Sequence, residues 1–537
     1  MKTNLLWVFT LVSHCLFAQE LTQSQKSKID SLFVSWTNSD KPGAAVAVVI
    51  GNRLVYKSTF GSADISSKKP LEGHTNFWIA SVSKQFTALG VSSLEEAGKL
   101  SIDDPVSKYI PELRQFPQVK VKHLLHHRSG LRDGYTLVGM TLRGEKHYDV
   151  QSVLAMLSRQ KQLNFEPGSA FQYVNSNYVL LALVIERVSG KPFHQFMRTE
   201  VFEPLGLKDA RIYDGRTTPG DAKGYYEKKG KYKAVKRFIP AVGSSGVLLS
   251  LEDAIAFEGA YHNPRKPYIL EAMENSEPQA NDGGHYRRGV ETHVVGGHTV
   301  VRHFGSDPGF RADILRLPEQ NLSVILFSNA NNYWDLGKHL FYIAGVVLDD
   351  SALKTFGSPA IDHPAPKEAK AWDGVYVDTT FRSARFIKYE NGILKASPSR
   401  QGYYKPLKSI AADTFSTQDV YEFTYTFEES ALQVAGVEGE HRFNKIDSAS
   451  FSHQIRHYEG VYYSDELRKR YRITYKHGRL RLSFFRMIHI DLHPIGKDLF
   501  YGSFSGDNIL QFTPGEAGRH TLLFNRDGIR NLHFRKK

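Results

Sequence analysis

Strand-like apolar patterns stand near both ends of the first 350 residues. Residues 44–50 are a run of small and β-branched apolar residues, separated by a Gly-Asn pair from a second run at 54–56. This arrangement is typical of a β-hairpin. Residues 311–317 and 322–327 are two more apolar runs around a Pro-Glu-Gln-Asn turn. The four runs predict an antiparallel sheet in which the two ends of the segment meet.

Between these runs, apolar residues follow the spacing of helices. One helical stretch begins at Ser81 and would turn Phe86 and Leu89 toward the core, and another spans residues 178–188. Helices between two pairs of strands predict one α+β domain over residues 24–350. It would be an antiparallel sheet flanked by helices, with an all-helical insert.

The rest of the chain has a different pattern. Residues 357–370 contain three prolines and little apolar periodicity, which is typical of a linker. Short alternating runs follow, and Trp372-Asp-Gly-Val-Tyr recurs as Tyr458-Glu-Gly-Val-Tyr at an offset of 86 residues. An Asn-Gly and a His-Gly pair share that offset, so we expect a repeat. It predicts two small all-β, barrel-like units over residues 371–452 and 456–537, or one joint barrel.

The N-terminus has the pattern of a secretory signal peptide. Lys2 supplies the positive charge, residues 5–17 form an apolar stretch too short to span a membrane comfortably, and Ala18 is suited to cleavage. We therefore expect residues 1–18 to be removed and the protein to be exported, periplasmic or secreted. Cys15, the one cysteine, would leave with them, which excludes disulfides and thiolate chemistry from the mature protein. No later run is long and apolar enough for a transmembrane helix.

The 537 residues carry a formal net charge of +13. Residues 456–537 hold 16 Lys and Arg against 8 Asp and Glu. Such a charge is found in nucleic-acid-binding proteins, but the chain has no nucleic-acid-binding motif and export argues against that partner. We expect a solvated basic surface, and the alternative is contact with an anionic wall polymer or membrane surface.

A serine followed three residues later by a lysine occurs four times, starting at Ser66, Ser81, Ser158 and Ser351. At helical spacing the two side chains share one face, where an unprotonated lysine can accept the serine proton. Of the four serines, only Ser81 directly follows an apolar stretch, Phe-Trp-Ile-Ala, and begins an amphipathic helix. Its partner Lys84 would be partly buried, which depresses a lysine pKa. Ser81 is the predicted nucleophile, although this pair alone fits a helix-capping serine beside a surface lysine equally well.

Two further motifs lie in suitable places. Tyr173 and Asn175 stand on the loop before the helix at 178–188, so both side chains would project the same way. A phenol can shuttle protons, and an amide can hold a substrate carbonyl or orient a lysine. His303 and Gly305 precede the second pair of strands, and a glycine there lets a substrate backbone approach closely. Taken singly, these motifs are equally typical of a buried tyrosine and a turn histidine.

Together these residues resemble the serine β-lactamase and penicillin-binding-protein superfamily, specifically its class C-like branch. Three motifs occur in the family's order: Ser81-x-x-Lys84, Tyr173-x-Asn175 and His303-x-Gly305. The segments at 123–131 and 202–207 are also similar to family segments. The branch includes class C β-lactamases, D-alanyl-D-alanine carboxypeptidases, D-aminopeptidases and related esterases. The resemblance covers residues 24–350 and implies a β-lactamase/transpeptidase-like fold.

The resemblance implies a role for each matched residue. Ser81 would attack a carbonyl and form an acyl-enzyme, while Lys84 and Tyr173 handle the proton. Asn175 would contact the substrate amide, and the backbone N–H groups of Ser81 and Ser306 would form an oxyanion hole. No metal or cofactor is implied.

One position departs from many family members. His303 stands where many lactamases and carboxypeptidases have a lysine that anchors a substrate carboxylate, and histidine is mostly uncharged at neutral pH. His303, Gly305 and Ser306 are predicted to bind the substrate. The predicted protein is an exported serine hydrolase acting on amide or ester bonds of D-amino-acid peptides, related wall-derived compounds or small esters. The alternatives are a non-turnover penicillin- or wall-peptide-binding protein, a true β-lactamase and a D-alanyl-D-alanine carboxypeptidase.

Three histidines, His123, His126 and His127, form another cluster that a metal ion would suit. No acidic residues support such a site, and the resemblance explains the stretch as helix and loop, so we expect no metal. A third hypothesis assigns function to the C-terminal repeats, as a carbohydrate- or surface-binding module.

Overall fold

A computed structural model describes residues 20–38, 40–141, 149–236, 242–263, 286–331, 336–356, 364–378, 383–398, 404–417, 423–436, 439–446, 455–484, 488–503, 507–514, 520–526 and 528–537. The expected signal peptide, residues 1–18, and residues 357–363 of the expected linker lie outside this part of the chain. None of the helices in the described part combines the length and the apolar character needed to cross a bilayer.

One antiparallel sheet organises the first part of the chain, with strands in the order β10-β11-β12-β13-β1-β2. The strands are β1 (Ala44–Ile50), β2 (Arg53–Phe60), β10 (Glu291–Val295), β11 (His298–Asp307), β12 (Phe310–Leu317) and β13 (Leu322–Ser328). Strand β1 pairs with β13 along its whole length, from Ala44 opposite Ser328 to Ile50 opposite Leu322. The prediction that the two ends of this part meet in one sheet is confirmed.

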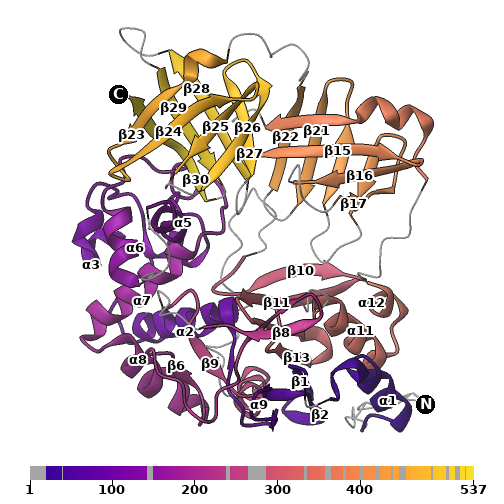
Figure 1. Ribbon diagram of the computed structural model, residues 1–537. Coiled ribbons are helices and arrows are strands. Elements are labelled where there is room, and N and C mark those ends of the chain that lie inside the picture. Colours follow the sequence, from indigo (N-terminus) through magenta and orange to yellow (C-terminus); the bar gives the residue numbers. More distant parts are fainter. Residues whose placement is uncertain are drawn as a thin grey trace, which may run out of the picture.

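Helices flank the sheet and form the insert. Those beside the sheet are α1 (Gln23–Ser31), α2 (Ser83–Glu96), α9 (Leu251–Tyr261), α11 (Leu336–Leu348) and α12 (Ser351–Thr355). Those of the insert are α3 (Val106–Tyr109), α4 (Val121–Leu125), α5 (Gly134–Gly139), α6 (Val150–Leu157), α7 (Asn175–Ser189) and α8 (Phe193–Phe196). Short strands form a three-stranded sheet, β5 (Phe77–Trp78), β9 (Val247–Leu249) and β6 (Arg211–Ile212), and two hairpins, β3 (Ser62–Asp64) with β4 (Lys69–Pro70) and β7 (Tyr225–Lys228) with β8 (Lys231–Ala234). We call everything from α1 to α12 the mixed domain (Figure 1).

Both faces of the six-stranded sheet are covered, which explains why β1 is apolar at every position. Ala45 and Ala47 share a core with residues of α2 and α9 on one face. Val46 and Val48 point the other way and share a core with residues of α1 and α11. Because side chains alternate along a strand, a strand buried on both faces reads as a continuous apolar run.

Helix α2 is buried over most of its length. Every residue from Ser83 to Val91 is buried, including Lys84. The prediction of an amphipathic helix with one buried face is therefore wrong. The helix is buried on more than one face because α2 packs against α7 on one side and shares a core with the sheet on the other.

Two all-β units follow the mixed domain. Within the described residues, the second unit is a closed barrel of eight strands, β23 (Gly460–Ser464), β24 (Lys469–Lys476), β25 (Arg479–Ser483), β26 (His489–Gly496), β27 (Leu499–Ser503), β28 (Asp507–Pro514), β29 (His520–Arg526) and β30 (Ile529–Lys536). We call it the terminal barrel. Each unit has a sheet of its own, so the alternative of one joint barrel is wrong and the predicted fold class is confirmed.

The first unit is a nine-stranded sheet that nearly closes. Its strands are β14 (Gly374–Asp378), β15 (Ala384–Glu390), β16 (Ile393–Ser397), β17 (Lys405–Pro406), β18 (Lys408–Ser409), β19 (Thr414–Ser416), β20 (Thr424–Phe427), β21 (Ala431–Gly436) and β22 (Gly439–Ile446). The two outermost strands, β17 and β18, are separated by a single residue, which brings the sheet's edges together.

The sequence repeat is also a structural repeat. In the first unit the Tyr376 hydroxyl donates to the Trp372 carbonyl at 2.9 Å, and in the barrel the Tyr462 hydroxyl donates to the Tyr458 carbonyl at 2.9 Å. Each tyrosine thus ties the first strand of its unit to the short helix before it. The repeated motif therefore builds the same junction between a short helix and the first strand in each unit.

The terminal barrel lies against the helical insert near α5 and α6, and the nine-stranded unit lies beside the barrel (Figure 1). The Tyr471 hydroxyl of β24 donates to the Met140 carbonyl at 3.1 Å. Buried residues of the barrel and of the mixed domain belong to one continuous hydrophobic cluster. Phe386 and Tyr501 join the two all-β units in an edge contact, with ring centroids 4.9 Å apart.

Candidate active site

The predicted nucleophile and its lysine meet at the start of α2. Ser81 lies in a short 3-10 helix, Ala80–Val82, that leads directly into α2. The Nζ atom of Lys84 is 3.0 Å from the Ser81 Oγ atom. By contrast, Ser66 and Lys69, which share the same spacing, hydrogen-bond to other groups. The structure brings Ser81 and Lys84 together as the sequence predicted.

The Lys84 amine is enclosed by polar acceptors. Besides Ser81, its Nζ atom contacts Asn175 Oδ1 at 3.0 Å and the Ser244 carbonyl oxygen at 2.8 Å. The residue is 0% exposed, more deeply buried than the sequence predicted. Asn175 is the first residue of α7, so the predicted Tyr-x-Asn motif reaches the lysine from the insert.

Burial sets the protonation of this amine. Desolvation lowers the pKa of Lys84 from its usual value to about 7, against the opposing fields of Asp307, Asp133 and Glu291. A substantial fraction of Lys84 is therefore a neutral amine at neutral pH, which is the form that accepts a proton.

Tyr173 stands over the same amine. Its ring centroid is 4.9 Å from Lys84 Nζ. Desolvation raises the pKa of Tyr173 well above its usual value, and a hydrogen bond with the Ser81 side chain opposes this. The phenol therefore keeps its proton at neutral pH and is a proton donor beside Ser81.

His127 fixes the loop that carries these residues. Its Nδ1 atom accepts from the Val174 backbone N–H at 3.2 Å and from Asn177 Nδ2 at 3.0 Å. Its ring also contacts the Tyr173 ring in a tilted arrangement, with centroids 4.3 Å apart. Burial lowers the pKa of His127 well below its usual value, so it is neutral. The sequence marked this histidine as part of a helix-to-loop segment and of the histidine cluster, and predicted no role for it beside Tyr173.

The three clustered histidines bind separate protein groups. His123 Nδ1 accepts from the Lys120 backbone N–H at 3.1 Å, and His126 Nδ1 donates to the Tyr286 carbonyl at 3.3 Å. Across the residues with described placement, no three His, Cys, Asp or Glu side chains gather as a metal site.

Gly305 lets β11 run against the backbone of Ser81. A Cβ atom at Gly305 would lie 2.4 Å from the Ile79 carbonyl oxygen and 3.2 Å from the Ser81 nitrogen. Strand β11 pairs with β10 as far as Arg302. The following residues of β11 lie beside the 3-10 helix that contains Ser81. Ser306 comes next and is exposed. The structure therefore brings the backbones of the two predicted oxyanion-hole residues to the same place.

His303 is buried rather than presented to solvent. It is 2% exposed, its Nε2 atom accepts from the Tyr286 hydroxyl at 3.0 Å and its Nδ1 atom donates to the Phe304 carbonyl at 2.8 Å. Desolvation lowers the pKa of His303 to about 4. The expected absence of a positive charge at this position follows from burial and not only from the usual pKa of histidine.

Asp307 anchors the end of β11. Its Oδ2 atom accepts from Trp78 Nε1 at 2.7 Å and from Ser245 Oγ at 2.6 Å. Desolvation raises the pKa of Asp307. Asp307 was not among the predicted site residues, and the sequence signal that could have indicated it is its place two residues after Gly305. It ties β11 to β5, the strand that precedes Ser81.

Comparison with known proteins agrees with this geometry. A family model described as Beta-lactamase matches residues 26–347. A penicillin-binding protein of Bacillus subtilis (strain 168) is 27% identical over 377 residues, which cover 66% of this chain and 81% of that protein. A D-aminopeptidase of Brucella anthropi is 29% identical over 303 residues, which cover 54% of this chain and 57% of that protein. This chain thus matches little more than half the length of that D-aminopeptidase.

Solved structures show the same fold. The octameric penicillin-binding protein homologue from Pyrococcus abyssi superposes with a TM-score of 0.56 at 24% identity, over 78% of this chain and 100% of that one. The D-amino acid amidase from Ochrobactrum anthropi SV3, complexed with L-phenylalanine, gives a TM-score of 0.52 at 23% identity, over 60% of this chain and 98% of that one. With the family model covering more than half of its residues, the chain belongs to the beta-lactamase family of serine hydrolases, as its three motifs predicted.

Proposed function

We propose that this protein is an exported hydrolase that forms an acyl-enzyme on Ser81 and cleaves amide or ester bonds of D-amino-acid peptides, related wall-derived compounds or small esters. The observation that carries the proposal is the buried Lys84 amine, whose Nζ atom lies 3.0 Å from Ser81 Oγ. Export is supported by the signal-peptide pattern of residues 1–18.

The hydrogen bonds of Lys84 support its role as the base. A neutral amine has two N–H donors and one lone pair. The acceptors Asn175 Oδ1 and the Ser244 carbonyl, at 3.0 and 2.8 Å, take the two N–H groups. The lone pair is then left for the Ser81 hydroxyl, which donates to it. This arrangement removes the proton from Ser81 as the hydroxyl attacks.

The remaining steps follow from the groups around Ser81. Negative charge develops on the substrate carbonyl oxygen, and the backbone N–H groups of Ser81 and Ser306 would stabilise it. The bond to the leaving amine or alcohol breaks as Tyr173, which holds its proton at neutral pH, donates that proton to the leaving group. The proton that Lys84 took from Ser81 then passes to Tyr173, which restores the neutral amine and the phenol. Water attacks the acyl-enzyme as Lys84 accepts its proton, and this proton returns to the Ser81 oxygen as the acyl bond breaks.

The neutral state of His303 supports the substrate class. A buried, uncharged imidazole supplies no cation for a substrate carboxylate, which lactamase and carboxypeptidase substrates carry. Amides and esters with a free amino group do not need that cation. Proteins similar to this chain are named D-aminopeptidase and D-amino acid amidase, which agrees with this choice.

Substrate turnover tests this proposal. We expect the full-length protein to hydrolyse D-amino-acid p-nitroanilides at least ~10-fold faster than their L-isomers, to hydrolyse short-chain p-nitrophenyl esters, and to turn over nitrocefin slowly. Spectrophotometric rates on the three substrate classes are the measurement. Preference for nitrocefin would instead support a β-lactamase. A stable covalent adduct without turnover on any of them would support the binding-protein alternative.

A cavity on the terminal barrel supports a second activity, contact with anionic polymers or surfaces. About 410 Å³ in volume, it lies over β25, β26 and β27 and is lined by Arg479, Arg481, His489, Asp491, His493 and Ser503, among others. Arg481 pairs with Asp491 at 2.7 Å, and Arg479 is exposed. Two arginines and two histidines against one carboxylate favour anionic ligands.

Charge reversal in this cavity provides the test. We expect the double variant Arg479→Glu/Arg481→Glu to bind inorganic polyphosphate at least ~5-fold more weakly than the parent, with less dependence on salt. Arg472→Glu is the control because Arg472 is exposed on neighbouring β24, outside the cavity. Anionic phospholipid vesicles, tested in parallel, separate a membrane surface from a polymer. Equal losses in cavity and control variants would indicate a diffuse basic surface instead.

A further inference from the structure

The turn between β29 and β30 reaches the insert beside the active site. The Gly528 carbonyl accepts from the Asp133 backbone N–H at 2.7 Å and from Asn164 Nδ2 at 3.1 Å. The Oδ1 atom of Asn164 in turn accepts from the Arg530 backbone N–H at 2.8 Å. Two residues of the insert are thus hydrogen-bonded to the tip of the terminal barrel.

Asp133 divides its carboxylate between two helices. Its Oδ1 atom accepts from the Thr136 backbone N–H at 2.8 Å and caps α5. Its Oδ2 atom accepts from the Asn175 backbone N–H at 2.9 Å, at the first residue of α7. Because the Asn175 side chain in turn accepts from Lys84, three hydrogen bonds in series lead from Gly528 to the catalytic amine.

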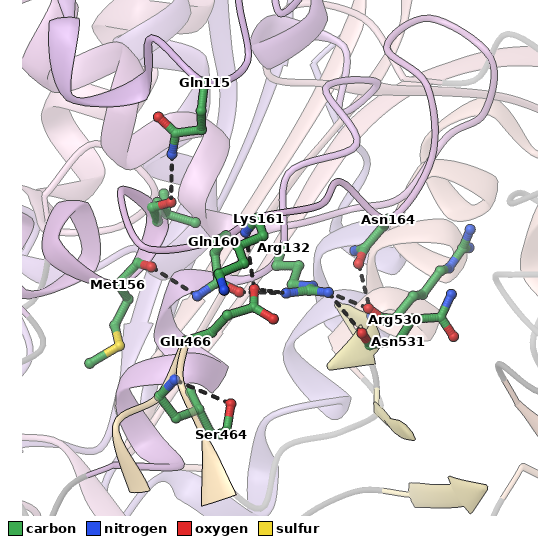
Figure 2. A network of polar contacts seen from close by, with 12 residues as sticks. Gln115, Arg132, Met156, Gln160, Lys161, Asn164, Ser464, Glu466, Arg530 and Asn531 are labelled. Carbon is green, nitrogen blue, oxygen red and sulfur yellow. Dashed lines mark hydrogen bonds and ion pairs between the residues drawn. The ribbon is translucent and has the colours of Figure 1, made fainter. Parts of the chain in front are cut away.

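The residue beside Asp133 holds the barrel in place. Arg132 is 1% exposed, and Figure 2 shows its guanidinium between the insert and the barrel. It donates to Glu466 Oε2 at 2.6 Å and to the carbonyls of Arg530 and Asn531 at 3.1 and 3.0 Å. It also donates to Gln160 Oε1 of the insert at 2.7 Å. A buried, charge-assisted network of this kind fixes two elements relative to each other.

We infer that the terminal barrel positions the active site. The turn at Gly528 fixes the position of Asp133, and Asp133 holds Asn175 in place against Lys84. Asp133 and Gly528 are positioning residues, since neither touches the reacting atoms. The inference rests on the proposed function, in which Asn175 orients the lysine. It also gives the barrel a role in catalysis that is separate from its basic cavity.

Two glycines in the barrel provide a matched pair of variants. Gly528 has φ of +72°, and a Cβ atom there would lie 2.6 Å from the Asp133 Cβ atom. Gly478, in the turn between β24 and β25, has φ of +79°, and a Cβ atom there meets nothing within 4 Å among the described residues. Alanine imposes the same left-handed backbone strain at both positions. Only Gly528→Ala also places a methyl group in steric conflict with Asp133.

We expect Gly528→Ala to lower kcat by about 10- to 100-fold with little change in KM, and Gly478→Ala to leave kcat within about twofold of the parent. Asp133→Ser is the second variant, because serine still caps α5 but lacks the oxygen that receives Asn175. It should lower kcat similarly. Since Asp133 loses its negative charge while Asp307 and Glu291 keep theirs, the acidic limb of kcat/KM should also move to lower pH.

Hydrogen exchange separates this inference from the proposed function. In Gly528→Ala, the amide of Asn175 should lose protection relative to Gly478→Ala, whether or not a substrate has been found. Equal kcat values and equal protection in two folded variants would overturn the positioning role. A parent protein without turnover or covalent labelling would overturn the proposed function alone.

Discussion

Replacing Ser81 with alanine is expected to lower kcat/KM by at least ~10³-fold and to abolish covalent labelling by a penicillin or a fluorophosphonate probe. We expect the variant to fold because Ser81 lies just before the start of α2, and among the described residues its hydroxyl contacts the Lys84 amine and the Tyr173 side chain. Intact-mass spectrometry of the labelled protein and initial rates on the best substrate are the measurements.

Ser66→Ala is the matched control for this variant. Ser66 has a lysine at the same spacing, is exposed, and donates its hydroxyl proton to Asp64. It should keep parental activity and labelling. Undiminished labelling of Ser81→Ala would contradict the assignment of the nucleophile.

Replacing Lys84 with methionine is expected to lower kcat/KM by about 10²- to 10⁴-fold, the usual contribution of a general base. In the parent protein, kcat/KM should fall about tenfold for each unit of pH below 7. The reason is that the pKa of Lys84 is about 7, so acid converts the amine to its unreactive ammonium form. Burial keeps the pKa of Tyr173 well above its usual value, so no alkaline limb from this phenol is expected near neutral pH.

The same substitution should make the protein more stable. A lysine with a depressed folded pKa binds fewer protons in the folded state than in the unfolded state, so its burial opposes folding at neutral pH, and this opposition fades as pH rises toward the usual lysine pKa. Methionine fills the space without that cost. A higher midpoint of thermal unfolding with lost activity is the expected pair of results. Lost activity with lower stability would mean that Lys84 serves mainly to hold the structure together.

The sequence predicted the parts of this protein that are encoded locally. The hairpin at β1, the helix after Ser81 and the strand pair around Gly305 each have their own apolar pattern, and the motifs lie directly on them. The repeat was visible because Trp372 and Tyr458 begin equivalent units. The structure brings Gly305 beside Ser81 where β11 lies against the start of α2, and Asn175 reaches Lys84 from the insert.

What the sequence did not predict depends on contacts between distant segments. The full burial of Lys84 arises because α7 covers the side of α2 that a periodicity argument leaves open to solvent. Asp133 has a signal of its own only as a helix cap, since the carbonyl that it binds belongs to Gly528 near the other end of the chain. Closure of the barrel likewise depends on β23 pairing with β30, which no local pattern specifies.

The continuous hydrophobic cluster shared by the mixed domain and the terminal barrel changes where the protein can be divided. Linkers usually mark the limits of independently stable pieces. Here, ending the chain at residues 357–370, where the sequence predicts a linker, would expose the apolar area of the insert that the barrel covers and would leave the Arg132 guanidinium without the Glu466 carboxylate. The barrel, although last in the chain, is therefore part of the smallest unit that unfolds cooperatively. We expect a protein shortened so that it ends before residue 357 to be partly unfolded.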